Sequence, residues 1–494
     1  MIRSRFPLIA AAASACLLLC SLVATNLSSV ASEAESRHDT YGGNRDFPAE
    51  STGFFYLREF DGRHFLVTPE GHGYRALGIN HFHMMTSQDY DGAIQQIKDW
   101  GFNAGCYQGP RWMWNRHPYT KGITLVPTSP YKSDDHFGFR DVFSPEFLVE
   151  LEETIQQIVE PQSENPFLIG YFWTDIGLWE RDRKGESWLS FFQSLPADSE
   201  GGKAWTEWKA GNRDADENEF LPLIAREIYS NAHRLIRKYD QNHLIFGDRW
   251  HEIDMPEAVV RESLPYVDAI AIQPTSQGYN HEFFEEVFEK YGKPIYIADH
   301  VSSFATEEFP VTMGQKAKNP EDFEAYYEKY VTTAFATPYL IGFNKCQYQD
   351  QGNPGQMLKQ GLIRASGVPY SVVDAIGEAN RKALQLAYSN KPIKAGEPTA
   401  TVSAPKVDER FKVSIGETFN GAFIVSPEIS EGGAVAGGTT LTLEAIPSSG
   451  YALDSLYSAV SGFRNWTVYR ESMSSPWQVT VDQDMEIGAS FIED

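Results

Sequence analysis

Short apolar runs alternate along most of the chain with longer stretches whose apolar residues recur at helical spacing. The first runs form a predicted hairpin at residues 53–82, where an Asp-Gly pair separates two strands and a buried strand ends near Asn80. Helical spacing then marks residues 89–100, 143–161, 218–240, 281–291, 321–337 and 370–389. The apolar runs between these helices predict strands at residues 102–107, 167–173, 243–250, 267–274, 294–299 and 339–348.

With a weaker strand at residues 123–126, the buried strands reach the number that a (β/α)8 barrel requires. Regular alternation of strands and helices predicts that the strands run parallel, in the α/β class. A doubly wound sheet is the alternative. It would need a glycine-rich phosphate turn after the first strand, and LGINHFHMM (77–85) has no such turn.

Composition changes toward both ends of the chain and predicts further segments. Residues 1–32 combine two early arginines, an apolar run and small polar residues, which is typical of a signal peptide. Residues 33–50 are polar and predict a disordered leader. The predicted barrel spans residues 51–390, followed by a Pro/Ala/Thr-rich linker at 391–406. Alternating strands and glycine clusters at 407–494 predict a small all-β accessory domain.

The chain is strongly acidic, with a formal net charge of −25, and loss of residues 1–32 removes two arginines and no acid, giving −27. This charge argues against nucleic acid as a partner. No later run is long enough to span a bilayer, so we expect a secreted or periplasmic protein, with cell-surface association as a further option. Outside the signal only Cys106 and Cys346 remain, and both lie in apolar runs that predict buried thiols. No metal-ligand spacing occurs, and no metal or cofactor is expected.

Two acids stand where predicted strands end. Asp175 closes the run NPFLIGYFWTD (165–175), and Asp299 closes KPIYIAD (293–299). Side chains at the C-terminal ends of barrel strands converge on one mouth. Two carboxyl groups there are what cleavage of a glycosidic bond needs, one as acid and one as nucleophile or base. The alternative is that each is an ordinary loop or helix-capping aspartate.

Other polar and aromatic residues near the strand ends are candidates for contacting a sugar. Aromatic rings suit the apolar faces of sugars, and amide or guanidinium groups suit hydroxyl groups. Arg111, Arg249 and Lys345 would form a positive site for an acidic sugar if they cluster, and otherwise each pairs with nearby carboxylates. We expect Lys345 to reach the exposed mouth, because an unpaired buried lysine is costly. The predicted substrate-binding set is Asn80, His81, Tyr107, Arg111, Trp173, Trp179, Arg249, Trp250, His251, Gln273, Lys345 and Gln347.

Several segments together resemble clan-A glycoside hydrolases. They are LVTPEGHGYRALGINH, WGFNAGCY, NPFLIGYFW, HLIFGDRW, VDAIAIQP, KPIYIAD and IGFNKCQYQDQ. The resemblance is greatest to the family 50 β-agarases, with family 42 β-galactosidases more distant. It covers roughly residues 53–385 and implies a retaining glycosidase with its acid/base after the fourth strand and its nucleophile after the seventh. GYALDSLY and DMEIGASF resemble glycine-rich β repeats of secreted bacterial proteins.

The chain departs from the family pattern at both acids. After the fourth strand the family has Asn-Glu, where this chain has Asp175-Ile176, and Asp299 replaces the second Glu. Asp175 lies between Trp173 and Trp179 in the sequence, and apolar burial there would favour its protonated form. We therefore expect Asp175 to be the general acid/base and Asp299 the nucleophile. Glu252 and Glu180 are substitute acids.

Three outcomes stay open at this point. Carboxyl groups about 5–5.5 Å apart predict a retaining enzyme, and about 6.5–9.5 Å an inverting one. The third outcome is a non-catalytic glycan-binding or surface protein, which the isoleucine at position 176 favours. A hydrolase using a serine nucleophile is disfavoured, because no G-x-S-x-G occurs. The leading hypothesis is a secreted glycoside hydrolase that acts on a polysaccharide such as an algal galactan.

Overall fold

The chain divides into two compact units, Met1–Asn390 and Lys391–Asp494. The predicted signal peptide and linker lie outside the described residues. Within the described part of the chain, no helix combines the length and apolar character needed to cross a membrane. The computed structural model describes residues 37–82, 85, 88–126, 138–175, 177, 179, 187–276, 278–307, 309–310, 315–351, 361–389, 410–416, 418, 420–429, 433–461, 467–472, 475–481 and 484–493.

An antiparallel sheet precedes the barrel and begins earlier than the sequence predicted. Its strands lie in the order β1-β4-β3-β2 and span Asn44–Pro48 (β1), Tyr56–Phe60 (β2), Arg63–Val67 (β3) and His72–Tyr74 (β4). The Asp61-Gly62 turn joins β2 to β3, and both residues have positive φ. The disordered leader predicted at 33–50 is wrong for its described part. The Asp39 carboxylate accepts hydrogen bonds from two nearby backbone amides and from His72, and these polar contacts order a segment poor in apolar residues.

The predicted (β/α)8 barrel is confirmed. It closes because β10 pairs with β11 and β13 pairs with β5, all in parallel. The third strand was expected at 123–126 and lies at Tyr119–Gly122. A buried tyrosine anchors that strand through hydrogen bonds with Gln162 and Asn165, contacts that no apolar run reveals. The strands are Ala76–Asn80 (β5), Ala104–Cys106 (β6), Tyr119–Gly122 (β7), Leu168–Asp175 (β8), Leu244–His251 (β9), Ile270–Gln273 (β10), Ile295–Phe304 (β11) and Leu340–Cys346 (β13), with Gln315–Ala317 (β12) pairing beside β11.

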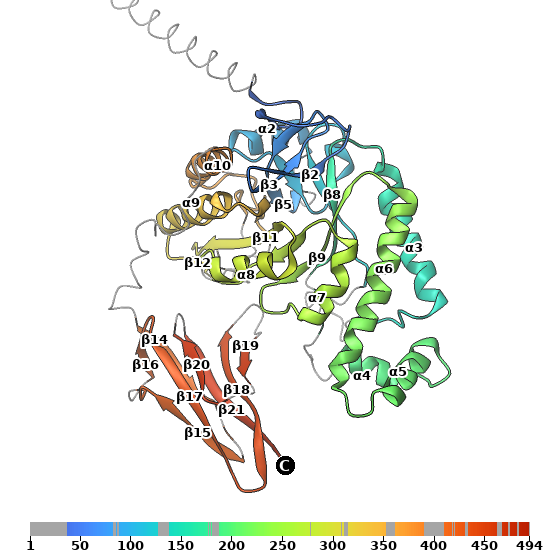
Figure 1. Cartoon of the computed structure of the whole chain (residues 1–494). Helices are drawn as coiled ribbons and strands as arrows, with labels where there is room; N and C mark the ends of the chain where they lie inside the picture. Colours follow the sequence, from blue (N-terminus) through green and yellow to red (C-terminus); the bar gives the residue numbers. More distant parts are fainter. Residues whose placement is uncertain are drawn as a thin grey trace, which may run out of the picture. The chain divides into compact units, whose positions relative to one another are not determined.

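Helices lie outside these strands (Figure 1). The predicted helices are present, and the predicted N-cap is confirmed because the Ser144 hydroxyl accepts from the Phe147 amide at 3.1 Å. Helices α4, α5 and α7 were not predicted, because they are short or weakly amphipathic. The helices are Tyr90–Asp99 (α2), Pro145–Val159 (α3), Trp188–Ser194 (α4), Glu200–Gly211 (α5), Leu221–Tyr239 (α6), Glu257–Ser263 (α7), His281–Tyr291 (α8), Pro320–Ala336 (α9) and Val373–Ala387 (α10).

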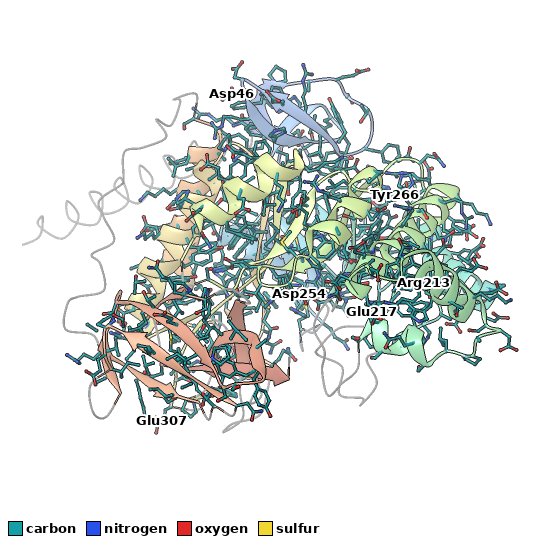
Figure 2. The ribbon with its side chains drawn as sticks, turned by 60° about the horizontal axis from the view of Figure 1, so that its bottom comes forward. Asp46, Arg213, Glu217, Asp254, Tyr266 and Glu307 are labelled. Atoms are coloured by element: carbon teal, nitrogen blue, oxygen red, sulfur yellow. The ribbon has the colours of Figure 1, made fainter. Side chains whose placement is uncertain are left out.

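Two apolar layers hold the barrel together, and side chains fill the space between helices and strands (Figure 2). The interior of the barrel holds a buried aromatic cluster of Phe172, Phe246 and Tyr296. Outside, the strands and helices share a larger core to which Trp173 and Trp188 belong. Burial of this apolar area is the main stabilising contribution to the fold.

Buried histidines predict how stability depends on pH. Burial, with a smaller contribution from Lys98, lowers the pKa of His117 to about 3. Burial, with Lys345, lowers the pKa of His300 to about 3. Each folded pKa lies below the unfolded value of about 6.5, so the folded state resists protonation. The stabilisation is present above about pH 6.5 and is lost as pH falls toward the folded pKa.

For His117→Gln we expect a flatter loss of stability on acidification. At pH 5 each buried histidine costs the wild type about 2 kcal/mol of unfolding free energy relative to neutral pH, and the variant lacks one such contribution. Urea unfolding at pH 7.5 and pH 5 measures the difference. The exposed His38, changed to Gln, is the matched control and should keep the wild-type slope. Equal slopes in all three proteins would contradict the prediction.

The second unit is all-β, as expected. Its strands form one sheet in the order β16-β14-β21-β18-β19 and another in the order β15-β17-β20, around a core that includes Leu443, Leu456 and Ile487. The strands are Arg410–Ile415 (β14), Gly421–Ser426 (β15), Ala434–Ala436 (β16), Thr440–Pro447 (β17), Tyr451–Ser461 (β18), Thr467–Ser472 (β19), Trp477–Thr480 (β20) and Met485–Glu493 (β21).

Candidate active site

Arg249 on β9 joins the two predicted acids. Its Nη2 lies 2.7 Å from Asp175 Oδ1, and its Nη1 lies 3.7 Å from Asp299 Oδ2. The guanidinium carbon is 3.5 Å from the centre of the Tyr107 ring, and the arginine is 1% exposed. Burial alone would lower the pKa of Arg249, but Asp175, Tyr107 and Asp299 together hold it above its ordinary value. The structure therefore brings both acids into contact with one buried cation.

Asp299 is held in place by a neighbouring strand. It is 5% exposed, and Asn80 at the end of β5 donates from Nδ2 to its Oδ1 at 2.8 Å. The same Asn80 amide group donates to the carbonyl oxygen of Ala298 at 3.0 Å. A carboxylate that accepts from an amide and faces a guanidinium is stabilised in its ionised form, as a nucleophile or base requires.

Asp175 is more open, and its surroundings differ from the prediction. Its side chain is 28% exposed, and Gln273 at the end of β10 donates from Nε2 to its Oδ1 at 2.6 Å. The apolar enclosure expected from Trp173 and Trp179 is wrong, because Asp175 contacts an arginine and an amide instead. Asp175 is therefore held by polar contacts and not by an apolar pocket.

The three tryptophans predicted to stack on sugars belong to the core instead. Trp173 is 1% exposed and stacks on Tyr229 of α6 with ring centres 5.3 Å apart. Trp179 packs between Trp188 and the same tyrosine, and Trp250 is equally buried. The pairing of β8 with β9 shifts register between Phe172 and Asp175. Such a bulge re-aims side chains, so Asp175 reaches the mouth while Trp173 faces the helices.

A buried carboxylate supports the end of β8 from behind. Asp248 accepts from the Thr174 backbone amide at 3.1 Å and from the Tyr229 hydroxyl at 2.6 Å. Burial raises the pKa of Asp248 to about 6, although these hydrogen bonds lower it. Since Thr174 directly precedes Asp175, this network fixes the backbone that carries the acid. This supporting role of Asp248 was not predicted.

The three predicted cations do not act together, because each has its own partners. Arg111, in the short 3-10 helix Arg111–Met113, is exposed and lies over the Trp114 ring at 5.6 Å. Lys345 is buried rather than exposed, and its Nζ donates to the backbone carbonyls of Ser302 and Cys346. Carbonyl oxygens compensate the buried ammonium group, so the expectation that Lys345 reaches the exposed mouth is wrong.

The remaining predicted residues differ in how far they reach the site. Tyr107 lies beneath Arg249, and burial raises its pKa although Arg249 lowers it. His81 directly follows β5 with φ 59°, a left-handed conformation. Gln347 is fully buried and donates to the Gln349 carbonyl at 2.5 Å. His251 is half-buried at the end of β9, where its backbone forms an isolated antiparallel β-bridge with Asp254.

The substitute acid Glu252 has a structural role. Its carboxylate accepts from the backbone amides of Thr275 and Ser276 and from the Asn280 side chain. Burial alone would raise the pKa of Glu252, but these hydrogen bonds hold it below its ordinary value. Glu252 also borders a cleft of about 370 Å³ between the segment after β9 and α8. Asp175 and Asp299 are not among the described residues that line this cleft.

Positions 176 and 180, the isoleucine and the other substitute acid of the sequence analysis, lie outside the described residues.

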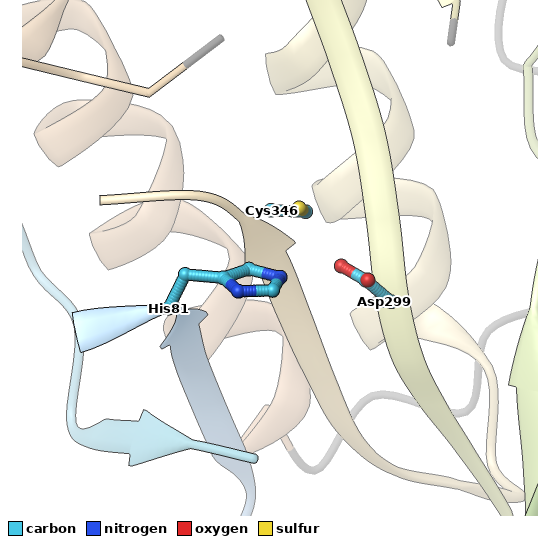
Figure 3. A group of neighbouring side chains, drawn as sticks. All are labelled: His81, Asp299 and Cys346. Atoms are coloured by element: carbon cyan, nitrogen blue, oxygen red, sulfur yellow. The ribbon is translucent and has the colours of Figure 1, made fainter. Parts of the chain in front are cut away.

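One residue of the site was missed altogether. Cys346, at the end of β13, is fully buried and forms no disulfide with another described residue, as predicted. Its Sγ, a carboxylate oxygen of Asp299 and a ring nitrogen of His81 all lie within 4.8 Å of one another (Figure 3). The three residues come from distant parts of the chain, so no local spacing could have indicated their proximity.

Comparison with known proteins supports the fold. No family model matches the sequence, and no curated protein matches it. Among solved structures, PfGH50B aligns with TM-score 0.62 at 18% identity over 74% of this chain and 72% of that chain. An exo-β-agarase aligns with TM-score 0.61 at 17% identity over 72% and 68%, and another agarase with TM-score 0.60 at 19% identity over 76% and 70%. The resemblance to family 50 β-agarases is thereby confirmed for the fold.

Proposed function

We propose that this chain is a glycoside hydrolase of agarase-like type that cleaves a polysaccharide, with an algal galactan as its substrate class. The observation that carries the proposal is that Asp175 and Asp299, from two different barrel strands, contact one buried guanidinium at the mouth. Because a barrel fold hosts many functions, the fold alone does not specify this one. The agarase activity of proteins with similar structures supports the substrate class.

In the proposed reaction Asp299 acts as the nucleophile. Its carboxylate attacks the anomeric carbon while the bond to the glycosidic oxygen breaks, and Asp175 donates a proton to the departing oxygen. Water then attacks the same carbon, Asp175 takes a proton from that water, and the sugar is released from Asp299. Asn80 positions the Asp299 carboxylate throughout. We propose retention of configuration, as the resemblance to the family 50 β-agarases implies.

In this proposal Asp175 acts as the acid only after its ion pair with Arg249 is broken. Arg249 already lies 3.7 Å from Asp299 Oδ2 through its other terminal nitrogen. If substrate displaces the guanidinium from Asp175, Arg249 remains paired with Asp299 alone. Asp175 would then hold a proton while Asp299 stays ionised, which is the division of roles that the reaction needs.

A second candidate function is non-catalytic glycan binding on a barrel that has lost hydrolysis. The observation in its favour is the 2.7 Å ion pair between Arg249 and Asp175, which occupies the carboxylate that a hydrolase would need as its proton donor. Such a protein would retain the same mouth and the same preference for sugars.

Agar, porphyran and carrageenan separate the two candidates. A hydrolase is expected to release new reducing ends from at least one of them, and a binder should associate with one without releasing product. NMR of the anomer first formed then reports retention or inversion. Absence of both product and binding across this panel would remove the galactan proposal.

We further propose that the protein is secreted or periplasmic. The apolar run at residues 6–24 after two arginines, and the strongly acidic composition, support export. Mass measurement of the extracellular protein should show loss of residues up to the 24–32 region. Retention of residues 1–24 in a purely intracellular product would contradict export.

A further inference from the structure

His81, Asp299 and Cys346 present three different ligand atoms to one point beside Arg249. They belong to or follow β5, β11 and β13, and their nitrogen, oxygen and sulfur atoms lie within 4.8 Å of one another. Figure 3 shows the imidazole and the carboxylate directed toward each other, with the thiol beside them. Asp299 and Cys346 are buried, and barrel strands fix both of them. The arrangement is therefore a property of the barrel and not of a mobile surface loop.

We propose that these three residues bind a soft divalent cation of the Zn²⁺ class. Zinc sites that keep an open coordination position use three protein ligands chosen from histidine, cysteine and carboxylates, with water as the fourth. A thiolate ligand selects zinc-like ions over Mg²⁺ and Ca²⁺, which prefer oxygen atoms. The set found here satisfies both criteria.

The observed spacing is compatible with such an ion after a small adjustment. Bonds of about 2.0–2.3 Å in a tetrahedral site place ligand atoms about 3.3–3.8 Å apart. The three atoms need to move inward by roughly an ångström at most. His81 is the ligand able to move, since it is half-buried and follows the end of its strand. Histidine is among the residues enriched in the left-handed conformation that His81 adopts.

The charges around the site also suit a dication. Arg249 faces Asp299 but has a second and closer carboxylate, Asp175, at 2.7 Å. Binding of a dication converts the Cys346 thiol to a thiolate and releases its proton. The site then holds two carboxylates and one thiolate against the dication and the buried side chains of Arg249 and Lys345, so that three negative charges offset most of four positive ones. Compensation of this kind reduces the cost of burying the ion.

Occupancy by the cation would block the proposed nucleophile. Asp299 cannot coordinate a metal ion and attack an anomeric carbon at the same time. This consequence, unlike the binding itself, rests on the proposed hydrolase function. Zinc and substrate should therefore exclude each other, and zinc should inhibit competitively.

Metal binding is tested on the full chain without any sugar. Equilibrium dialysis with Zn²⁺ followed by metal analysis should give one ion per chain. Co²⁺ in its place should show the charge-transfer absorption of a cobalt–thiolate bond. We expect Cys346→Ser and His81→Ala each to weaken binding at least about 100-fold, which corresponds to about 2.8 kcal/mol. Mg²⁺ and Ca²⁺ should not compete.

Cys106→Ser is the matched control. Cys106 is also a buried barrel thiol, but its Sγ neighbours the Tyr296 hydroxyl at 3.8 Å. This variant should keep both the stoichiometry and the cobalt–thiolate band. Absence of stoichiometric binding, or a band that persists in Cys346→Ser, would overturn the proposed site.

Inhibition is tested as the ratio of rates with and without Zn²⁺ within each protein. This ratio should approach one in Cys346→Ser and stay low in Cys106→Ser. If zinc binds but no polysaccharide is hydrolysed, the hydrolase proposal fails and the metal site stands. If hydrolysis occurs and zinc binds without slowing it, the competition between metal and substrate is refuted.

Discussion

Replacing Asp299 by Asn is expected to lower the rate of polysaccharide hydrolysis by about 10³-fold or more, because an amide cannot form the glycosyl–enzyme bond. Asn keeps the size of the side chain, and its Oδ1 can still accept from the Asn80 amide. The fold should therefore survive, as circular dichroism and thermal unfolding would show. Asp175→Asn should also abolish turnover of the polysaccharide, because the departing oxygen then receives no proton.

The two variants should differ on an aryl glycoside with an acidic phenol as leaving group. A stable phenolate departs without a proton, so Asp175→Asn should retain the first chemical step and show a burst of phenol. Asp299→Asn should show none, since it lacks the nucleophile. This comparison assigns the roles without reference to the polysaccharide.

Asp350→Asn is the matched control for both variants. Asp350 follows the last barrel strand and is buried, but it binds the Tyr370 hydroxyl at 2.7 Å and the Gly361 amide at 2.8 Å. We expect it to keep near-normal rates. Near-normal hydrolysis by both Asp175→Asn and Asp299→Asn would refute the two-carboxylate mechanism.

For Arg249→Met we expect the largest loss of stability among these substitutions, about 3–5 kcal/mol of unfolding free energy at neutral pH. Removing the guanidinium leaves Asp175 and Asp299 without their shared cation, and the empty space beside Tyr107 adds a packing cost. Urea unfolding at pH 7 measures the loss.

Arg226→Met is the matched control for the arginine. Arg226 makes a bidentate contact with Glu262, but its side chain is 59% exposed. An exposed pair of this kind contributes about 1 kcal/mol or less. Equal destabilisation by the two substitutions would mean that Arg249 is not the electrostatic centre of the site.

Periodicity predicted most of the barrel because its strands are buried on both faces and its helices are amphipathic. The third strand was misplaced because β7 owes its burial to one tyrosine and to hydrogen bonds, whereas the apolar residues at 123–126 follow it. Helices α4 and α5 were not predicted, because aromatic packing within a long segment after β8 stabilises them and they have no regular apolar stripe.

The site was predictable only as far as strand ends are. Asp175, Asn80 and Gln273 each close a barrel strand, as expected. Asp299 differs from the expectation, because it lies within β11, which continues to Phe304. Strict alternation of side chains failed at the bulge before Asp175, so that Trp173 faces the helices while Asp175 does not. The roles of Arg249 and Cys346 depend on neighbours across the barrel, and a sequence without coordinates does not show which side chains meet there.

The early start of the folded sheet limits where the chain can be shortened. A protein that begins at residue 51 lacks β1 and Asp39, leaving β4 without one neighbour and His72 without its carboxylate. An unpaired strand of this kind offers its backbone to other chains and promotes aggregation. Proteolytic maturation that ends before residue 38 leaves the Asp39–His72 pair and β1 in place, whereas removal of β1 exposes the backbone of β4 at the edge of the sheet.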